Sequence, residues 1–187
     1  MSVIKAIKKR DPAIRSWLEV LLYPALWCMF FHRQAHFLYR IRLYFLARLL
    51  SQWSRFLTGI EIHPGARIGR GFFVDHGMGV VIGETCEIGD NVLIYHGVTL
   101  GATTSDKGSR HPIVGNDVII GAGATVLGRV HIGNGAKVGA GALVLKDIPE
   151  CGTIVGEPGR FVSEASTRRE LEELKKRVAE LKGLVDS

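Results

Sequence analysis

Two short polar segments combine the residue types that general acid–base chemistry needs. They are residues 61–64 (Glu-Ile-His-Pro) and residues 74–77 (Val-Asp-His-Gly). A carboxylate beside an imidazole fixes the ring tautomer and raises its basicity, and such a pair can remove the proton of a hydroxyl group. The resulting oxygen nucleophile can attack a thioester. Glu61 and His76 are therefore the candidate pair, and the alternative is that Asp75 and His76 are polar turn residues.

A third polar segment, residues 110–112 (Arg-His-Pro), has the chemistry of a carboxylate-binding site. The guanidinium of Arg110 offers a planar fork of donors that matches a carboxylate, and His111 can assist it. The alternative is a solvated loop tip, because the surrounding residues are polar.

Two further segments, residues 121–124 and 139–142, both read Gly-Ala-Gly-Ala. Small side chains let a ligand lie against the backbone and bond to its amides, as an extended pantetheine arm requires. The alternative is that tight corners need small residues for their own packing.

An aliphatic residue recurs at every sixth position over most of residues 62–144. The series is Ile62, Ile68, Val74, Ile82, Ile88, Ile94, Leu100, Val114, Ile120, Val126, Ile132, Val138 and Val144. This period is typical of a parallel β-helix, in which each aliphatic side chain points inward and stacks on the one below. A Gly or Asn near each corner tolerates the positive φ of the turn. The period slips before Ile82 and breaks at residues 101–113, a polar excursion of the kind that often carries function.

Helical patterns flank the repeat. Near the N-terminus, Trp17, Leu18, Leu21 and Leu22 share a face, Pro24 marks a break or kink, and helical spacing continues through Phe37, Ile41, Tyr44, Phe45, Arg48 and Leu49. We expect a small helical cap that buries these faces against the β-helix or another subunit. Residues 167–170 fit a capping box, and Leu171, Leu174, Val178, Leu181 and Val185 step as in a helix, either a short coiled coil or a helix packed on the body.

The predicted organisation has three parts. Residues 1–58 form the helical segment, residues 59–162 the β-helix with its excursion at 101–113, and residues 163–187 a C-terminal helix and tail. An apolar content of 47% excludes a disordered chain of 187 residues.

Charge and cysteine content narrow the function classes. The net charge is +6, and the first 60 residues hold roughly ten Lys and Arg against Asp11 and Glu19. Aromatic residues fall at helical spacing rather than among the charges, so neither a nucleic acid nor a membrane is the expected partner, although an anionic substrate would suit the segment. Three scattered cysteines predict reduced thiols in a cytoplasmic protein and show no metal spacing. No signal peptide is visible at the N-terminus.

Longer stretches around these residues resemble the serine O-acetyltransferases of the short bacterial type, within the hexapeptide-repeat acyltransferase superfamily. The resemblance covers nearly the whole chain and is carried by residues 10–13, 58–65, 74–85, 95–101, 110–112 and 120–124. The Asp-His-Gly and Arg-His-Pro segments at this separation are its most specific part. It implies a left-handed parallel β-helix that forms trimers with ligand grooves between neighbours.

The resemblance also implies roles for individual residues. His76 would be the general base on the hydroxyl of L-serine, with Glu61 as its acidic partner, and acetyl-CoA would be the co-substrate in a ternary complex without a covalent enzyme intermediate. The implied serine contacts are Asp11, Asp75, Arg110 and His111, with Glu84 as a supporting carboxylate. The implied CoA groove contains Ala102, Thr103, Ala122, Lys137 and Ala140. L-Cysteine, a serine analogue, is the expected inhibitor at Asp75, Arg110 and His111.

The chain departs from the family pattern in three places. Residues 101–104 read Gly-Ala-Thr-Thr where the family usually reads Gly-Gly-Thr-Gly, which restricts the backbone where the thioester should sit. The chain ends at Ser187 instead of the isoleucine through which family members bind a sulfhydrylase, so we do not expect that complex. The helical segment is shorter than in the long form, which leaves the choice between a trimer and a dimer of trimers open.

Three other functions are alternatives to serine acetylation. A sugar or amino-sugar acceptor fits the fold, but a neutral sugar has no carboxylate for Arg110. A zinc carbonic anhydrase needs three converging histidines, and the histidines of the repeat are well separated, so no metal is expected. A non-catalytic scaffold would use the basic N-terminal segment and the C-terminal helix as contacts.

Overall fold

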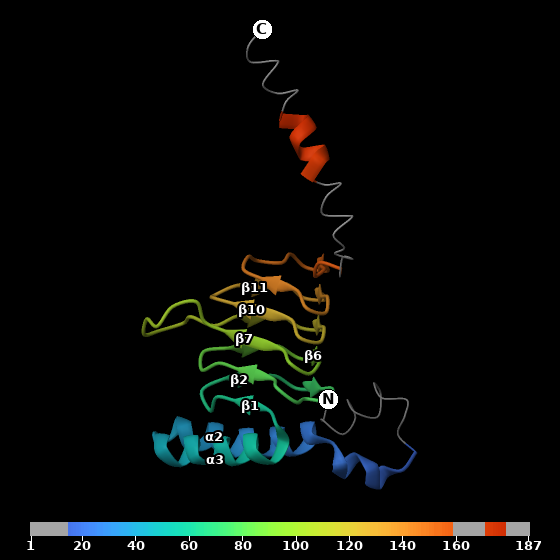
Figure 1. The fold of residues 1–187 in the computed structure, drawn as a ribbon. Helices are drawn as coiled ribbons and strands as arrows, with labels where there is room; N and C mark the ends of the chain where they lie inside the picture. The colour runs from blue at the N-terminus through green and yellow to red at the C-terminus, as the bar shows by residue number, and fades with distance from the viewer. Residues whose placement is uncertain (1–14, 159–170, 179–187) are drawn as a thin grey trace. The chain divides into compact units, whose positions relative to one another are not determined.

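The chain between Glu61 and Ile154 winds through three sheets of parallel strands (Figure 1). Each of the first four turns places one short strand in every sheet, and the last turn places strands in sheets A and C. Sheet A contains β1 (Glu61–Ile62), β4 (Val81–Ile82), β7 (Thr99–Gly101), β10 (Thr125–Leu127) and β13 (Leu143–Val144). Sheet B contains β2 (Arg67–Ile68), β5 (Glu87–Ile88), β8 (Ile113–Val114) and β11 (His131–Ile132). Sheet C contains β3 (Phe73–Val74), β6 (Leu93–Ile94), β9 (Ile119–Ile120), β12 (Lys137–Val138) and β14 (Thr153–Ile154).

This architecture is the predicted parallel β-helix, seen here in a computed structural model that describes residues 15–158 and 171–178. The sixfold series is confirmed as its core, because every member is buried except Ile68, which is half-buried. A second inward position, two residues before each of them, is also buried and holds residues such as Ala66, Cys86 and Ala124. Each buried aliphatic side chain contributes about 1.5–3 kcal/mol to folding, so the coils form a rigid scaffold.

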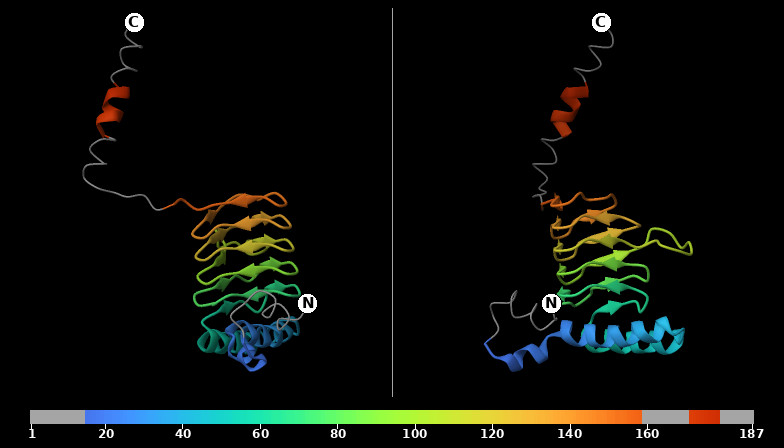
Figure 2. Two further views of the ribbon diagram at one scale, coloured as in Figure 1. Left: turned by 90° about the vertical axis from the view of Figure 1, so that its right-hand side faces the viewer. Right: turned by 180° about the vertical axis from the view of Figure 1, so that it is seen from behind.

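The connections from sheet C to sheet A form one corner of the coil, which we call the CA corner. Residues 75–80 make its lowest level, and the two-residue slip in the period lies here. The connections from sheet A to sheet B form the AB corner, which includes residues 83–86 and the excursion at residues 102–112. The excursion projects from the stack of coils between β7 and β8 (Figures 1 and 2).

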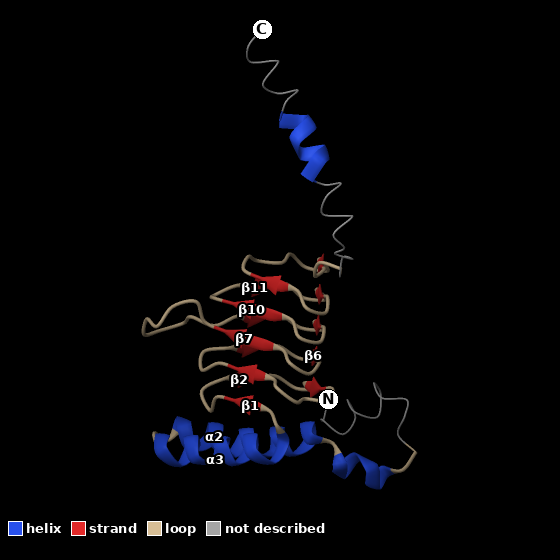
Figure 3. Ribbon diagram, in the orientation of Figure 1, coloured by secondary structure: helices blue, strands red, loops and turns tan. Residues whose placement is uncertain are grey.

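A helical cap lies across the base of the coils, below β1 (Figure 3). It consists of the short 3-10 helix η1 (Trp17–Leu22), α2 (Pro24–Arg40) and α3 (Tyr44–Thr58). Pro24 occupies the first turn of α2, where the missing N–H costs nothing, so the predicted break falls there. Ala25, Cys28 and Met29 of α2 join the buried core of the coils.

The continuous helical spacing predicted from Phe37 to Leu49 is wrong. The chain turns at residues 41–43 between α2 and α3, and Arg42 has a φ of 65°. A helix cannot continue through a left-handed residue, so α3 begins afresh at Tyr44 and packs alongside α2. It ends at Gly59, whose φ of 70° gives a left-handed cap.

The large apolar residues that the sequence pattern placed on the buried faces of the cap do not pack against the coils, which corrects the first half of that expectation. Helix α3 buries its small residues Ala47, Ser51, Ser54 and Thr58. The apolar residues predicted to be covered are exposed in the single chain: Trp17, Leu18, Leu21, Leu22, Phe37, Ile41, Tyr44, Phe45 and Leu49. Burial against another subunit stays a prediction.

Residues 157–187 form a separate unit. Within it, residues 171–178 are helical, and Leu171, Leu174 and Val178 are exposed. The capping-box segment 167–170 and the apolar positions Leu181 and Val185 lie outside the described residues. Across the described ranges, no helix combines the length and the apolar character needed to cross a membrane.

Candidate active site

The CA corner presents His76 to solvent. His76 follows β3 with a φ of 60°, a left-handed conformation that is uncommon for a non-glycine residue, and 76% of its side chain is exposed. Its Nε2 atom lies 3.9 Å from Oδ1 of Asp75, a long and exposed contact. The next residue, Gly77, has a φ of 72°, and a Cβ there would collide with Ile60. The corner therefore turns sharply and aims the imidazole away from the coil.

A column of residues continues upward from His76 along the same corner. The rings of His76 and His96 lie 6.0 Å apart and meet edge to face. Gly123 N–H donates to the His96 carbonyl at 2.9 Å, and Gly141 N–H donates to the Ala122 carbonyl at 2.8 Å, so Ala122 and Ala140 stack above the histidines. The candidate base and two candidate CoA-groove residues thus line one edge of the coil.

The glycines of this column partly support the alternative that tight corners need small residues for their own packing. A Cβ at Gly121 would lie 2.6 Å from the Ala140 nitrogen, so packing alone excludes a side chain there. A Cβ at Gly123 or Gly141 would meet nothing within 4 Å, although the φ of each, 68° and 67°, still favours glycine. The outer side of the column is open space beside the backbone.

Glu61 has other partners than His76 in the single chain. Its Oε1 and Oε2 atoms pair with Arg48 at 3.4 Å and with Arg55 at 3.2 Å, both from α3. Glu61 and His76 both lie in the described part of the chain, and no hydrogen bond or ion pair joins them there. The structure therefore ties Glu61 to the helical cap, and its pairing with an imidazole remains a prediction.

The AB corner holds His111 by a set of bonds centred on Thr85. The Thr85 hydroxyl lies 2.8 Å from Nδ1 of His111 and accepts the backbone N–H groups of Arg110 and His111 at 3.0 and 3.2 Å. The backbone N–H of Thr85 donates to the same Nδ1 at 3.2 Å. Because Nδ1 is an acceptor here, the neutral ring carries its proton on Nε2.

The imidazole of His111 packs against Gly83, where a Cβ would overlap the ring. Burial lowers the pKa of His111, the positive charge of Arg110 lowers it further, and Glu84 opposes both. The ring is therefore neutral at pH 7 and offers Nε2–H as a donor. A neutral donor beside a guanidinium is a suitable pair for a carboxylate.

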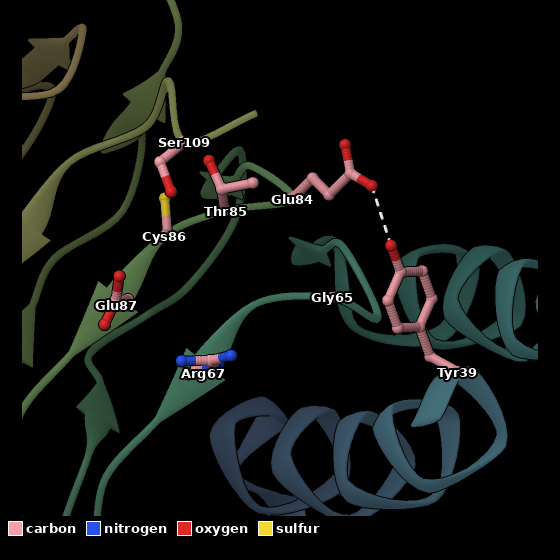
Figure 4. A pocket seen from close by; sticks show the side chains of 8 residues that line it. All are labelled: Tyr39, Gly65, Arg67, Glu84, Thr85, Cys86, Glu87 and Ser109. Carbon is pink, nitrogen blue, oxygen red and sulfur yellow. Dashed lines mark hydrogen bonds between the residues drawn. The ribbon is translucent and has the colours of Figure 1, made fainter. Parts of the chain in front are cut away.

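Arg110 is oriented by two acceptors. Its Nη2 atom donates to Oε2 of Glu84 at 3.3 Å, and its Nη1 atom donates to the carbonyl of Asp106 in the excursion at 2.6 Å. The hydroxyl of Tyr39, from α2, donates to the other oxygen of Glu84 at 2.8 Å (Figure 4). Tyr39 and Glu84 border two neighbouring cavities of about 230 and 370 Å³.

The remaining candidates occupy separate places. Ala102 and Thr103 begin the excursion, and Thr103 is exposed beside Gly128. Lys137 is an exposed residue of β12, two positions before the Gly139 corner. Asp11 lies outside the described residues. Within residues 15–158 and 171–178, no cluster of three His, Cys, Asp or Glu side chains could hold a metal ion.

Nine of the candidates form two groups on opposite edges of sheet A. Asp75, His76, Ala122 and Ala140 follow strands of sheet C, at the CA corner, whereas Glu84, Ala102, Thr103, Arg110 and His111 follow strands of sheet A, at the AB corner. Among the described residues no hydrogen bond or ion pair links the two groups. One chain therefore presents two half-sites.

Comparison with known proteins assigns this arrangement to a family. Residues 111–146 match the model of the bacterial transferase hexapeptide (six repeats). Serine acetyltransferase of Bacillus licheniformis is 56% identical over 85% of this chain and 74% of its own length, and that of Helicobacter pylori strain 26695 is 55% identical over 86% and 95%. The chain belongs to the serine acetyltransferase family.

Crystal structures of serine acetyltransferases share the fold. The Brucella abortus enzyme in complex with coenzyme A superposes with a TM-score of 0.80 at 42% identity, over 87% of this chain and 65% of that one. The soybean enzyme complexed with serine gives a TM-score of 0.79 at 48% identity, over 85% and 66%. This chain thus spans about two thirds of the length of these two serine acetyltransferases.

The sequence alone assigned no role to three residues that contact members of the candidate site. Tyr39, Thr85 and Arg55 contact Glu84, His111 and Glu61 respectively. Thr85 follows Glu84 in the segment 74–85, whose resemblance to the family was a signal that could have pointed to it. Tyr39 and Arg55 come from the helical cap, and only the placement of the cap under the coils brings them to the site.

Proposed function

We propose that this chain transfers the acetyl group of acetyl-CoA to the hydroxyl of L-serine, giving O-acetyl-L-serine for cysteine biosynthesis. The observation that carries the proposal is the pair of oriented donors at the AB corner, Arg110 and the Nε2–H of His111. They suit the carboxylate of an amino acid, whereas a neutral sugar has no carboxylate for them to bind.

His76 is the proposed general base. It takes the proton of the serine hydroxyl while the oxygen attacks the thioester carbonyl, forming a C–O bond and a tetrahedral oxyanion. Collapse of that intermediate breaks the C–S bond, and the proton passes from the imidazolium to the thiolate of CoA. No acyl-enzyme forms, so both substrates must be bound together.

Glu61 is proposed as the carboxylate that stabilises the imidazolium. Its ion pairs with Arg48 and Arg55 hold the carboxylate in place. The proposal requires the exposed imidazole of His76, from this chain or a neighbouring one, to reach Glu61 during turnover.

The other substrate contacts follow from the two half-sites. Asp75 and Asp11 are proposed to bind the serine ammonium, Arg110 and His111 its carboxylate, and Glu84 supports Arg110. The CoA arm is proposed to lie along the open column at Ala122 and Ala140 and toward Lys137, with Ala102 and Thr103 near the thioester. The coenzyme A complex of the Brucella relative supports a groove for this ligand on the shared fold.

A homotrimer is proposed to assemble the complete site. The half-sites lie on opposite edges of sheet A, and rotation of a second copy about an axis parallel to the coil can place its AB corner against the CA corner of the first. His76 of one chain would then act on serine held by Arg110 of the next.

L-Cysteine is proposed as a competitive inhibitor. It carries the same ammonium and carboxylate groups as serine, and a relative from Entamoeba histolytica was crystallised in complex with cysteine. The proposal predicts that cysteine raises the KM for serine without changing the limiting rate at saturating serine.

Release of free CoA tests the proposed reaction. Acetyl-CoA is supplied with L-serine or with a galactoside, for the wild type and for His76→Ala. Serine-dependent release that is lost in the variant is expected. Equal rates with the galactoside would move the acceptor to a sugar, and no release with serine would reject the proposal.

A further inference from the structure

A single carboxylate connects the helical cap to the amino-acid half-site. Glu84 accepts a hydrogen bond from the Tyr39 hydroxyl on Oε1 at 2.8 Å (Figure 4). Its Oε2 accepts a second one from Arg110 Nη2 at 3.3 Å. The two donors come from α2 and from the end of the excursion. The orientation of Glu84 is therefore set from both sides.

The phenol of Tyr39 is itself held in place. Its ring meets those of Tyr44 and His63 edge to face, with centroids 5.1 and 5.8 Å away. One turn earlier on α2, Nδ1 of His36 lies 2.7 Å from the carbonyl oxygen of Pro64 and donates to it. Two side chains of one helix face thus bind the AB corner at successive levels, which fixes α2 against it.

The hydroxyl of Tyr39 remains a donor at every physiological pH. Burial, chiefly, and the neighbouring Glu84 raise the pKa of Tyr39 to about 12. A bond to an ionised carboxylate is among the stronger side-chain hydrogen bonds. Loss of this bond leaves Glu84, whose side chain is 35% exposed, free to change rotamer and withdraw from Arg110.

We propose that Tyr39 is a positioning residue for the acceptor amino acid. By holding Glu84, it keeps the guanidinium of Arg110 in the orientation that receives the substrate carboxylate. The inference rests on the proposed function, because it takes Arg110 to be the carboxylate-binding residue. Tyr39 does not touch the reacting atoms, so it should affect binding of the amino acid more than the chemical step.

Tyr44 provides a matched control for the aromatic packing. It lines the same 370 Å³ cavity, and its hydroxyl makes no hydrogen bond to any described residue. Tyr39→Phe and Tyr44→Phe each remove one hydroxyl and keep the ring. If Tyr39 served only to pack the cap, the two variants would behave alike.

Steady-state kinetics of CoA release, with serine and acetyl-CoA varied in turn, test the inference. Tyr39→Phe is expected to raise the KM for serine about three- to tenfold, with kcat and the KM for acetyl-CoA within about twofold of the wild type. Tyr44→Phe should match the wild type. In a Glu84→Ala background, which removes the acceptor and raises the same KM, Tyr39→Phe should add little, because the two act through one contact.

Several results would overturn the inference. They are an unchanged serine KM in Tyr39→Phe, an equal change in Tyr44→Phe, or additive effects of Tyr39→Phe and Glu84→Ala. Thermal denaturation of each variant shows whether a loss reflects unfolding, and Glu84→Ala tests the same contact from its other partner. A wild type that does not acetylate serine would instead reject the proposed function, a result separate from any difference between the variants.

Discussion

The hydroxyl of Thr85 and Nδ1 of His111 lie 2.8 Å apart, and this contact sets the orientation of the proposed carboxylate-binding pair. The same hydroxyl accepts the backbone N–H groups of Arg110 and His111. One side chain thus fixes both the backbone and the ring tautomer of the segment.

Removal of that hydroxyl should weaken serine binding. Thr85→Val keeps the shape but leaves two N–H groups and Nδ1 without this partner, at a cost of about 1–3 kcal/mol for each buried group left unsatisfied. We expect the KM for serine to rise at least about tenfold. Thr85→Ser retains the hydroxyl and should stay close to the wild type. A serine KM that is unchanged in Thr85→Val, measured by CoA release, would contradict the assigned role.

Replacement of Glu61 should separate catalysis from stability. The arginines that pair with it are about half exposed, with side-chain exposures of 47% and 57%, so each pair contributes less than about 1 kcal/mol to folding. Glu61→Gln should therefore unfold at nearly the wild-type urea concentration, yet lose about 10- to 100-fold in kcat if the carboxylate supports the base.

Arg55→Met is the control for this prediction, because it breaks one of the same ion pairs and leaves the carboxylate in place. Its kcat should stay within about threefold of the wild type. If Arg55→Met and Glu61→Gln lose turnover equally, Glu61 acts only as an anchor for the cap.

The fold could be predicted from the sequence because its signal is local and repeated. An aliphatic residue at each sixth position requires only that successive coils stack, and the structure buries Ile94 or Val126 for that reason. The break in the series marks the excursion that carries Arg110. The packing of the helical cap was harder to predict, because the same aromatic spacing fits a helix whichever face it buries. Helix α3 turns the face with its small residues inward.

The candidate site could be predicted residue by residue but not as a geometry. The types of His76 and Arg110 are plain in the sequence, whereas their placement on opposite edges of sheet A depends on which connection each follows. The contacts of Glu61 with Arg48 and Arg55 depend on how the cap docks, which a local pattern does not encode.

Stability should fall in mild acid because of His32. Its side chain is buried in α2, and Nδ1 makes no hydrogen bond to any described residue. Burial, aided by the charges of His36 and Arg33, lowers the pKa of His32 to about 3. The unfolded chain therefore takes up this proton first as the pH falls. The contribution of neutral His32 to the free energy of unfolding is fully present above about pH 6.5. It is lost between pH 6.5 and about 3, at up to about 1.4 kcal/mol per pH unit.

Urea unfolding at pH 7 and pH 5, at one protomer concentration, measures this dependence. From pH 7 to pH 5, the free energy of unfolding should fall by about 2 kcal/mol more in the wild type than in His32→Leu. His131→Leu, which removes an exposed histidine, should keep the wild-type slope. Equal slopes in the wild type and His32→Leu would show that His32 does not titrate as described.

The left-handed His76 should lower the stability of the fold and yet be essential to turnover. Its φ of 60° is tolerated better by Asn, so His76→Asn should unfold no earlier than the wild type. Loss of the general base should lower kcat by about 10²- to 10⁴-fold. A variant with a clearly lower melting temperature would show that the imidazole serves the structure of the corner.

Subunit complementation tests the central claim most directly, that serine is acetylated at a site made from two half-sites on neighbouring chains. His76→Ala and Arg110→Ala are each purified, shown to be inactive, then unfolded together in equal amounts and refolded. If the site pairs His76 of one chain with Arg110 of the next, about a quarter of all sites in randomly assembled trimers, homotrimers included, regain both residues. Serine-dependent CoA release near a quarter of the wild-type rate is the predicted result. No activity above that of the separately refolded variants would contradict the shared site.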